Sequence, residues 1–195
     1  PAGMVTTAKK TDDGWLLNGI KRWVTNGSMA HVAVLWAQTQ EIGDSRGIRG
    51  FLVPTDHTGV TARDLRGKLS LRASDSSELH LEDVEVPDTA LLPNTEGLKS
   101  ALGCLTQARY GIVWGALGAA MACFHEAVNY SRERVVFGGT LAMKQIQQLR
   151  LADMLTGITQ GQLLALQLGR LKDRGAMTAE QVSLGKRSNV NMACE

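Results

Sequence analysis

The chain has 195 residues, of which 44% are hydrophobic, and a formal net charge of +2 at pH 7. This length suits one domain or two small ones with a real apolar core, and the nearly balanced charge gives no reason to expect a nucleic-acid partner. Three cysteines form no Cys-x-x-Cys pair, which argues against a disulfide framework and for a reducing compartment. The four histidines lack metal-ligand spacing, so we expect no metal site.

Both ends of the chain suggest a fragment. The sequence starts at Pro1 without a methionine and stops at Glu195 within a helix-like stretch. Its first residues also lack the basic start and apolar run of a signal peptide. The most apolar stretch, Tyr110 to Phe124, is too short to cross a bilayer, so we expect a buried core helix and no membrane span.

Short runs of strand-forming residues alternate with turn signals up to about residue 95. The runs are Gly14 to Gly19, Lys21 to Thr25, Ala30 to Ala37, Ile48 to Val53, Val60 to Arg63 and Glu78 to Val86. The last run alternates at period two and is closed by Pro87. Several short strands at this spacing predict a β-sandwich or β-barrel domain over residues 1–95.

The apolar period becomes helical after Gly97 and continues through Phe124. We expect this helix to end at Gly138-Gly139 and a second one to run from near Leu141 toward Leu171. Thr178 has the sequence context of an N-cap for a third helix. Residues 96–195 are therefore predicted to form part of a helical bundle, which makes the whole chain α+β.

Three glycines and one arginine stand out in the first predicted helix. Gly111, Gly115 and Gly118 weaken a helix, so we expect them to let a neighbouring helix approach closely. Arg109 falls on an otherwise apolar face, where an unpaired buried charge costs several kcal/mol. Its partner is either an internal carboxylate or an acidic group of a substrate, and the residue pattern leaves both open. Cys104 is expected to be a packing residue.

Two segments have side chains suited to a planar, phosphate-bearing cofactor. In Trp23-Val24-Thr25 the tryptophan can stack beside a ring and the threonine can bond its heteroatoms, although both are also ordinary strand residues. Arg134 offers a fork of donors for phosphate, and Gln145 lies in the opening turn of a predicted helix, where free backbone donors favour anions. Phe137 between them either covers an adenine or anchors the turn.

Taken together, these segments resemble the acyl-CoA dehydrogenase family in order and separation. The resemblance rests on Trp23-Val-Thr25, on the helix entered at Gly97, on Arg134-x-x-Phe-Gly…Gln145 and on Leu151-Ala-Asp-Met154. Three further segments look like the glutaryl-CoA dehydrogenase branch: Leu102 to Ala120, Gly47 to Phe51 and Gly67 to Ser74. The resemblance covers essentially the whole chain.

The resemblance implies that the chain is the middle β domain, followed by part of a C-terminal four-helix bundle. It implies that Trp23, Val24 and Thr25 lie on FAD, and that Arg134, Phe137 and Gln145 contact the FAD diphosphate of a neighbouring subunit in a tetramer. It also implies that Cys104, Leu105, Thr106, Gln107, Ala108 and Arg109 line the acyl-CoA thioester.

The implied reaction is removal of the α-proton by a glutamate and of a β-hydride by flavin. The glutaryl branch then decarboxylates the product to crotonyl-CoA and passes electrons to an electron-transfer flavoprotein. Such an enzyme belongs in a bacterial cytoplasm or in the mitochondrial matrix.

Three expected features of the family are absent from these 195 residues. They are the Gly-Ser-Asp flavin loop, the late Gly-rich segment and the glutamate in a Tyr-Glu-Gly-Thr context. We therefore expect no catalytic residue here and an inactive fragment. The alternatives are an acyl-CoA oxidase or nitroalkane-oxidase type of flavoenzyme, and a non-catalytic binding or assembly module on the same scaffold.

Overall fold

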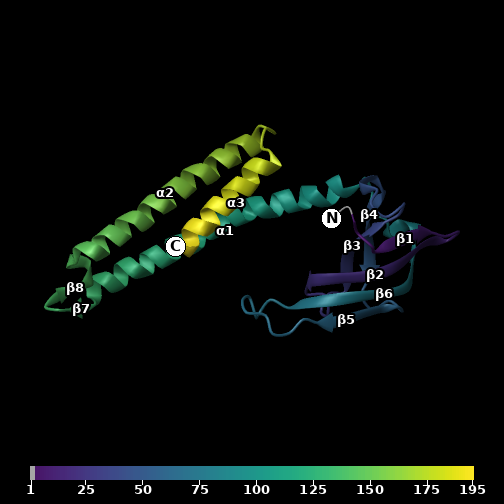
Figure 1. Ribbon diagram of the computed structural model, residues 1–195, viewed down its shortest axis with the longest axis horizontal. Helices are drawn as coiled ribbons and strands as arrows, with labels where there is room; N and C mark the ends of the chain where they lie inside the picture. The colour runs from purple at the N-terminus through teal and green to yellow at the C-terminus, as the bar shows by residue number, and fades with distance from the viewer. Residues whose placement is uncertain (1–2) are drawn as a thin grey trace. The chain divides into compact units, whose positions relative to one another are not determined.

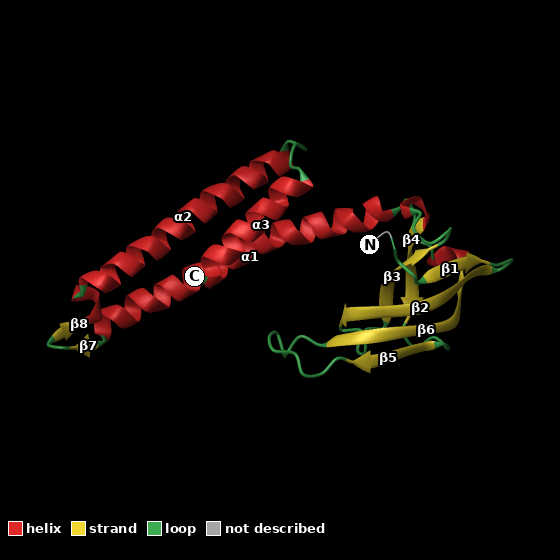
Figure 2. Ribbon diagram, viewed as in Figure 1, coloured by secondary structure: helices red, strands yellow, loops and turns green. Residues whose placement is uncertain are grey.

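The computed structural model describes residues 3–195, which form two compact units (Figure 1). One unit ends at Gly103 and the other spans Cys104–Glu195. We call them the β unit and the helical unit, because strands make up nearly all of the first and helices nearly all of the second (Figure 2). This order of strands and then helices confirms the predicted α+β fold class.

Six strands form a single mixed sheet in the β unit. They are β1 (Thr7–Lys10), β2 (Gly14–Thr25), β3 (Val32–Gln38), β4 (Ile48–Pro54), β5 (Val60–Asp64) and β6 (Ser76–Pro87). Their order in the sheet is β4-β3-β1-β2-β6-β5, and only β1 and β3 pair in parallel. The sequence did not predict β1, and it divided β2 into two runs.

The sheet curls around one core. The ring of Trp15 on β2 meets the ring of Phe51 on β4 edge-on, with centroids 5.4 Å apart. Two strands lie between β2 and β4 in the sheet, so this contact requires strong curvature. Leu79, Leu81 and Val84 of β6 belong to the same buried cluster as Phe51. Of the two predicted architectures, the single curled sheet is nearer to a barrel than to a sandwich.

Three long helices and a short hairpin make up the rest of the chain. They are α1 (Leu98–Glu133), the hairpin strands β7 (Val135–Val136) and β8 (Gly139–Thr140), α2 (Gln145–Asp173) and α3 (Ala179–Cys194). The predicted end of the first helix was wrong, because Gly138-Gly139 belongs to the hairpin and α1 already stops at Glu133. The second helix also begins later than predicted, after a 3-10 turn over Leu141–Met143.

The predicted start of the third helix is confirmed. The Thr178 hydroxyl accepts a hydrogen bond from the backbone N–H of Gln181 at 3.3 Å. The Gln181 side-chain oxygen accepts one from the backbone N–H of Thr178 at 2.9 Å. This reciprocal pair is a capping box, which satisfies two backbone donors at the helix end.

Close helix contacts occur at other glycines than those predicted. A Cβ added to Gly161 would lie 2.8 Å from Leu117, and one added to Gly185 would lie 2.4 Å from Leu168. By contrast, a Cβ at Gly111, Gly115 or Gly118 would meet no atom within 4 Å. The prediction for these three residues was therefore wrong within this chain, because α2 and α3 pack on the opposite face of α1, the face that carries Val113 and Leu117.

One buried asparagine joins all three helices. The side-chain amide of Asn189 on α3 donates to the backbone oxygen of Val113 on α1 at 3.1 Å and to that of Gly161 on α2 at 3.3 Å. Asn189 is only 1% exposed, and its Oδ1 has no hydrogen-bond partner among residues 3–195. The fixed directions of these bonds set the register of α3 against both neighbours.

Helix α1 is more exposed than predicted. It runs for 36 residues without a break and extends beyond the apolar stretch Tyr110 to Phe124 at both ends. By length and composition it is the one described helix able to cross a membrane, a test that long helices of soluble bundles also pass. Only Val113, Leu117, Ala120 and Ser131 of α1 are buried within this chain.

Candidate functional site

Trp23 occupies a bulge at the end of β2. The pairing of β2 with β6 shifts between Lys21 and Val24, which leaves Trp23 outside the ladder. Its φ of +63° is unusual for a bulky residue, and its side chain is 65% exposed. Bulges re-aim side chains and are common beside functional sites. The local backbone therefore turns this indole outward, where a planar ligand can reach it, while Val24 packs against the core.

The turn that follows β2 is tied to the segment before β6. The backbone N–H of Asn26 donates to the Asp75 backbone oxygen at 3.1 Å. The Ser28 hydroxyl donates to the Asp75 carboxylate at 2.7 Å, and the Ser28 N–H donates to the Ser77 hydroxyl at 3.1 Å. These bonds hold the end of β2, and with it Trp23 and Thr25, in one position.

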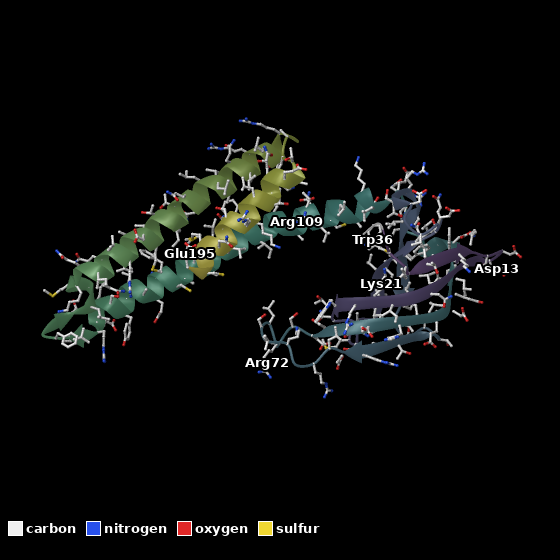
Figure 3. All side chains as sticks on the ribbon, in the orientation of Figure 1. Asp13, Lys21, Trp36, Arg72, Arg109 and Glu195 are labelled. Atoms are coloured by element: carbon white, nitrogen blue, oxygen red, sulfur yellow. The ribbon has the colours of Figure 1, made fainter. Side chains whose placement is uncertain are left out.

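Lys21 is the strongly perturbed base of the β unit. Burial lowers its pKa from 10.5 to about 8, because desolvation disfavours the charged ammonium. Its Nζ lies 3.4 Å from the thioether sulfur of Met4, and no carboxylate pairs with it among the described residues. Figure 3 labels Lys21 on the sheet. No pattern in the sequence points to Lys21, because lysine is a common surface residue in strands.

Arg134, Phe137 and Gln145 come together at one end of the helical unit. Arg134 follows α1 directly, and its backbone oxygen accepts from Leu141 N–H at 2.9 Å across the hairpin. Phe137 forms the hairpin loop with Gly138, and both have positive φ, as a type I′ turn requires. Gln145 is the first residue of α2. The structure thus groups the three predicted phosphate-side residues on consecutive elements.

The start of α2 leaves backbone donors free. Its N-cap residue Lys144 makes no side-chain cap hydrogen bond, and the first turn contains no acidic residue. Free N–H groups and the positive end of the helix dipole favour an anion there. The Gln147 amide donates to the buried Ser131 hydroxyl at 3.3 Å, which fixes α2 to the end of α1. This end can therefore present cationic and N–H donors to a phosphate without rearranging.

The hairpin loop stores strain that a substitution should release. Phe137 has φ +49° and is 98% exposed, so a strained aromatic residue gains nothing from packing within this chain. We expect Phe137→Asn to raise the free energy of unfolding by about 1 kcal/mol, because Asn-Gly is the favoured type I′ pair. Urea denaturation measures the change. Phe137→Leu keeps the strain and should give no gain; equal stabilisation by both variants would rule out backbone strain as the cause.

The Cys104–Arg109 segment lies in the first turns of α1 within the helical unit. Cys104, Leu105, Gln107 and Ala108 are exposed, whereas Thr106 and Arg109 are half-buried. Cys104 was expected to pack in a core and does not, since all three free cysteines are exposed. Arg109 has no carboxylate partner among the described residues. An internal ion pair, one of its two predicted partners, is therefore not found there.

The two groups of predicted residues on the helical unit are far apart. At 1.5 Å per residue, α1 from Arg109 to its end at Glu133 is about 36 Å long. Arg134 and Gln145 lie beyond that end, whereas the Cys104–Arg109 segment lies at the other. One chain therefore cannot bring the two groups to the same point.

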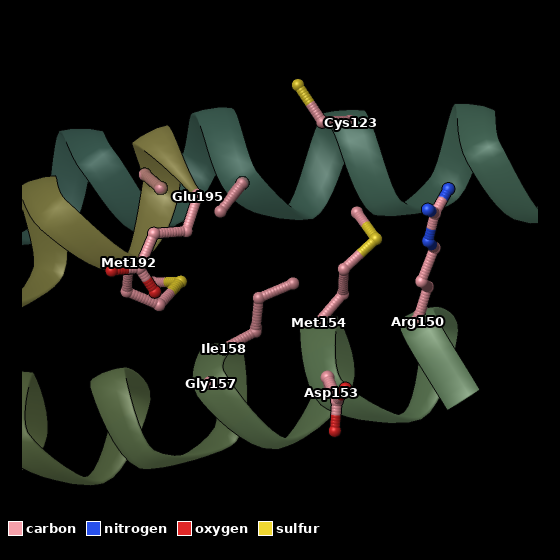
Figure 4. A pocket seen from close by; sticks show the side chains of 10 residues that line it. Cys123, Arg150, Asp153, Met154, Gly157, Ile158, Met192 and Glu195 are labelled. Carbon is pink, nitrogen blue, oxygen red and sulfur yellow. The ribbon is translucent and has the colours of Figure 1, made fainter. Parts of the chain in front are cut away.

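A cleft between the three helices contains none of the predicted site residues. It has a volume of about 590 Å³ and lies between α1, α2 and α3. In Figure 4, Arg150, Met154 and Ile158 on α2 face α1, and Met192 projects from α3. Among residues 3–195 no group of three or more His, Cys, Asp or Glu side chains is arranged to hold a metal ion.

Two family models match the chain. The middle domain of acyl-CoA dehydrogenases matches residues 1–84, and the C-terminal domain of acyl-CoA dehydrogenases matches residues 95–195. The chain belongs to the acyl-CoA dehydrogenase family. The predicted resemblance is thereby confirmed, and the curled sheet and the helices are the family's middle and C-terminal domains.

Relatives in this family include a short-chain specific acyl-CoA dehydrogenase and a glutaryl-CoA dehydrogenase. The human mitochondrial short-chain specific acyl-CoA dehydrogenase is 36% identical over 182 residues, which cover 93% of this chain and 44% of the relative. The glutaryl-CoA dehydrogenase of Desulfococcus multivorans is 34% identical over 176 residues, which cover 89% of this chain and 45% of the relative. The chain thus spans less than half the length of these two relatives.

A solved structure extends the likeness. The glutaryl-CoA dehydrogenase of Mycobacterium smegmatis, crystallised in complex with FADH2, is 50% identical. The two structures superpose with a TM-score of 0.92 over 99% of this chain and 49% of the other. This acyl-CoA dehydrogenase chain therefore corresponds to about half of that enzyme.

Proposed function

We propose that this chain is part of an FAD-dependent dehydrogenase that acts on glutaryl-CoA and releases crotonyl-CoA and carbon dioxide. The observation that carries the proposal is the 50% identity to the M. smegmatis glutaryl-CoA dehydrogenase over nearly the whole chain. Bound FAD would accept the hydride from the β-carbon of the thioester. Reduced flavin would then be reoxidised by an electron-transfer flavoprotein.

We propose that Trp23, Val24 and Thr25 hold one side of the flavin ring system. The outward indole at the bulge and the fixed turn after it support this role. Arg134, Phe137 and Gln145 would bind the diphosphate end of FAD in a neighbouring copy of a tetramer. The length of α1, which separates them from the proposed thioester segment Cys104–Arg109, supports the two-copy arrangement.

The general base of the family lies outside the residues given roles here. No Tyr-Glu-Gly-Thr segment occurs among the 195 residues, so we propose that the chain alone binds flavin without turning over substrate. The domain boundary stays proposed at residues 95–96, which is at the start of the second matched model and after the end of the first at residue 84.

The test is a titration of the chain with FAD, followed by glutaryl-CoA, while the flavin absorbance is recorded. We expect flavin to bind without bleaching. Bleaching would mean that a carboxylate of this chain acts as base, which would contradict the inactive-chain proposal. If no flavin binds, the same titration on a longer reading frame decides between a flavoenzyme and a non-catalytic module.

Two further measurements on the active enzyme identify its substrate and its electron acceptor. Butyryl-CoA serves as the competing substrate, because the human short-chain enzyme is also a relative. Release of carbon dioxide from glutaryl-CoA but not from butyryl-CoA supports the glutaryl proposal, and a higher kcat/KM for butyryl-CoA overturns it. Rapid reoxidation of the flavin by oxygen would indicate an oxidase instead of a dehydrogenase.

A further inference from the structure

A basic cleft lies between α1 and α3 in the helical unit. Its lining residues are Arg109, Ser183, Lys186, Arg187, Val190 and Asn191, and its volume is about 350 Å³. Three of these six residues are cations and none is a carboxylate. Figure 3 labels Arg109 at the point where α3 passes α1. Nothing in the sequence pattern links Lys186 or Arg187 to Arg109.

The packing of α3 on α1 brings the three cations together. Asn189 bonds to the backbone oxygen of Val113, one helical turn beyond Arg109. Gly185 lies beside Leu168 and Val113 and lets α3 approach both neighbouring helices closely. Lys186 and Arg187 follow Gly185 on α3 and line the same cleft as Arg109. Buried contacts thus fix the backbone positions from which the three cations extend.

The cleft lacks a compensating negative charge. None of Arg109, Lys186 and Arg187 forms an ion pair with any residue of the described chain. Like charges held close together repel each other, and the half-buried position of Arg109 reduces the screening by water. A bound anion would remove this repulsion. Of the two partners expected for Arg109, the structure therefore favours an anionic ligand.

We propose that this cleft binds a phosphate group. Two guanidinium forks suit the tetrahedral oxygens of phosphate, and an ammonium adds a point charge. The Asn191 amide can supply a neutral donor, whereas the Ser183 hydroxyl already donates to the Ala179 backbone oxygen at 2.8 Å. A group with two negative charges matches three cations better than a carboxylate does. Free inorganic phosphate and the phosphates of coenzyme A share this chemistry. The coenzyme A source rests on the proposed function and would replace the thioester contact proposed there for Arg109.

The test measures binding by NMR, without flavin or substrate turnover. Inorganic phosphate and adenosine 3′,5′-bisphosphate are titrated separately into the whole chain, and the amide signals of residues 183–191 are followed. We expect saturable shifts confined to this segment and to the neighbourhood of Arg109. The Lys186→Gln/Arg187→Gln double variant should weaken binding at least tenfold, since it removes two charge-assisted contacts.

Two controls make the result specific. Lys9→Gln/Arg63→Gln removes the same charges from exposed positions of the β unit and should change the affinity less than twofold. Arg187→Lys keeps the charge and should lose less affinity than Arg187→Gln, while circular dichroism checks that every variant is folded. Equal weakening by the two double variants would mean a general charge effect and would overturn the proposal.

The two ligands identify the source of the phosphate. Tighter binding of the bisphosphate by tenfold or more, lost in the cleft variant, assigns the site to a coenzyme A type ligand. Similar affinities assign it to free phosphate. Absence of saturable binding of either ligand overturns the phosphate site. Because the readout needs no flavin, failure here and failure of the FAD titration are distinguishable.

Discussion

Replacing Arg134 by alanine should weaken FAD binding by about 10- to 100-fold, equivalent to about 1.4–2.8 kcal/mol. Arg134 is exposed beside the uncapped start of α2, where a phosphate would accept from both a guanidinium and free backbone N–H groups. Removing the side chain leaves only the backbone donors. The dissociation constant is measured by quenching of flavin fluorescence, in the protein form that binds FAD.

Arg132 provides a matched control for this prediction. It is exposed in the last turn of α1, carries the same charge and has no proposed contact with the cofactor. Arg132→Ala should change FAD affinity by less than about threefold, through long-range charge alone. Similar losses in both variants would show that Arg134 contributes only general positive charge, and the proposed diphosphate contact would have to be abandoned.

Replacing Asn189 by aspartate should destabilise the helical unit by about 3–5 kcal/mol. The substitution puts carboxylate oxygens opposite the backbone oxygens of Val113 and Gly161, which now accept from the side-chain amide. The site is buried, so water cannot solvate the new charge. Urea denaturation followed by circular dichroism at pH 7 measures the loss.

Two apolar variants separate charge from packing at the same position. Asn189→Leu loses both hydrogen bonds but fills similar space, and the two backbone oxygens keep their own helical N–H donors. It should cost only about 1 kcal/mol, and Asn189→Ala about 2 kcal/mol because it also leaves a cavity. If Asn189→Asp were as stable as Asn189→Leu, water would have to reach this position. The proposal that Asn189 holds the three helices together through buried hydrogen bonds would then be refuted.

Sequence patterns within a single segment predicted those helices and strands whose signals lie within that segment. The alternation of Glu78 to Val86 gave most of β6, and Thr178 with Gln181 gave the start of α3. Short β1 was missed because Thr7–Lys10 is polar at every position except Ala8, and it forms only by pairing with β2 and β3. Gly138-Gly139 predicts a helix end as readily as a hairpin, because glycine is common in both, and here it belongs to the hairpin.

The residues of the candidate site could be predicted from the sequence only because their segments resemble those of a known family. Trp23 stood out as a strand residue, but its bulge depends on the register of β2 against β6. The basic cleft depends on how α3 crosses α1, and no periodicity of a single helix encodes a crossing. Lys21 likewise contacts Met4 of the N-terminal segment, and the pattern of β2 does not contain this contact.

The partly buried ammonium of Lys21 also affects how the protein behaves in an electric field. The sequence gives an isoelectric point of about 8.6, in which each lysine counts as fully charged near that pH. With a pKa of about 8, Lys21 has lost more than half of its charge there, whereas the unfolded chain retains it. The native chain should therefore focus at a lower pH than the denatured chain, and its solubility minimum should move with it.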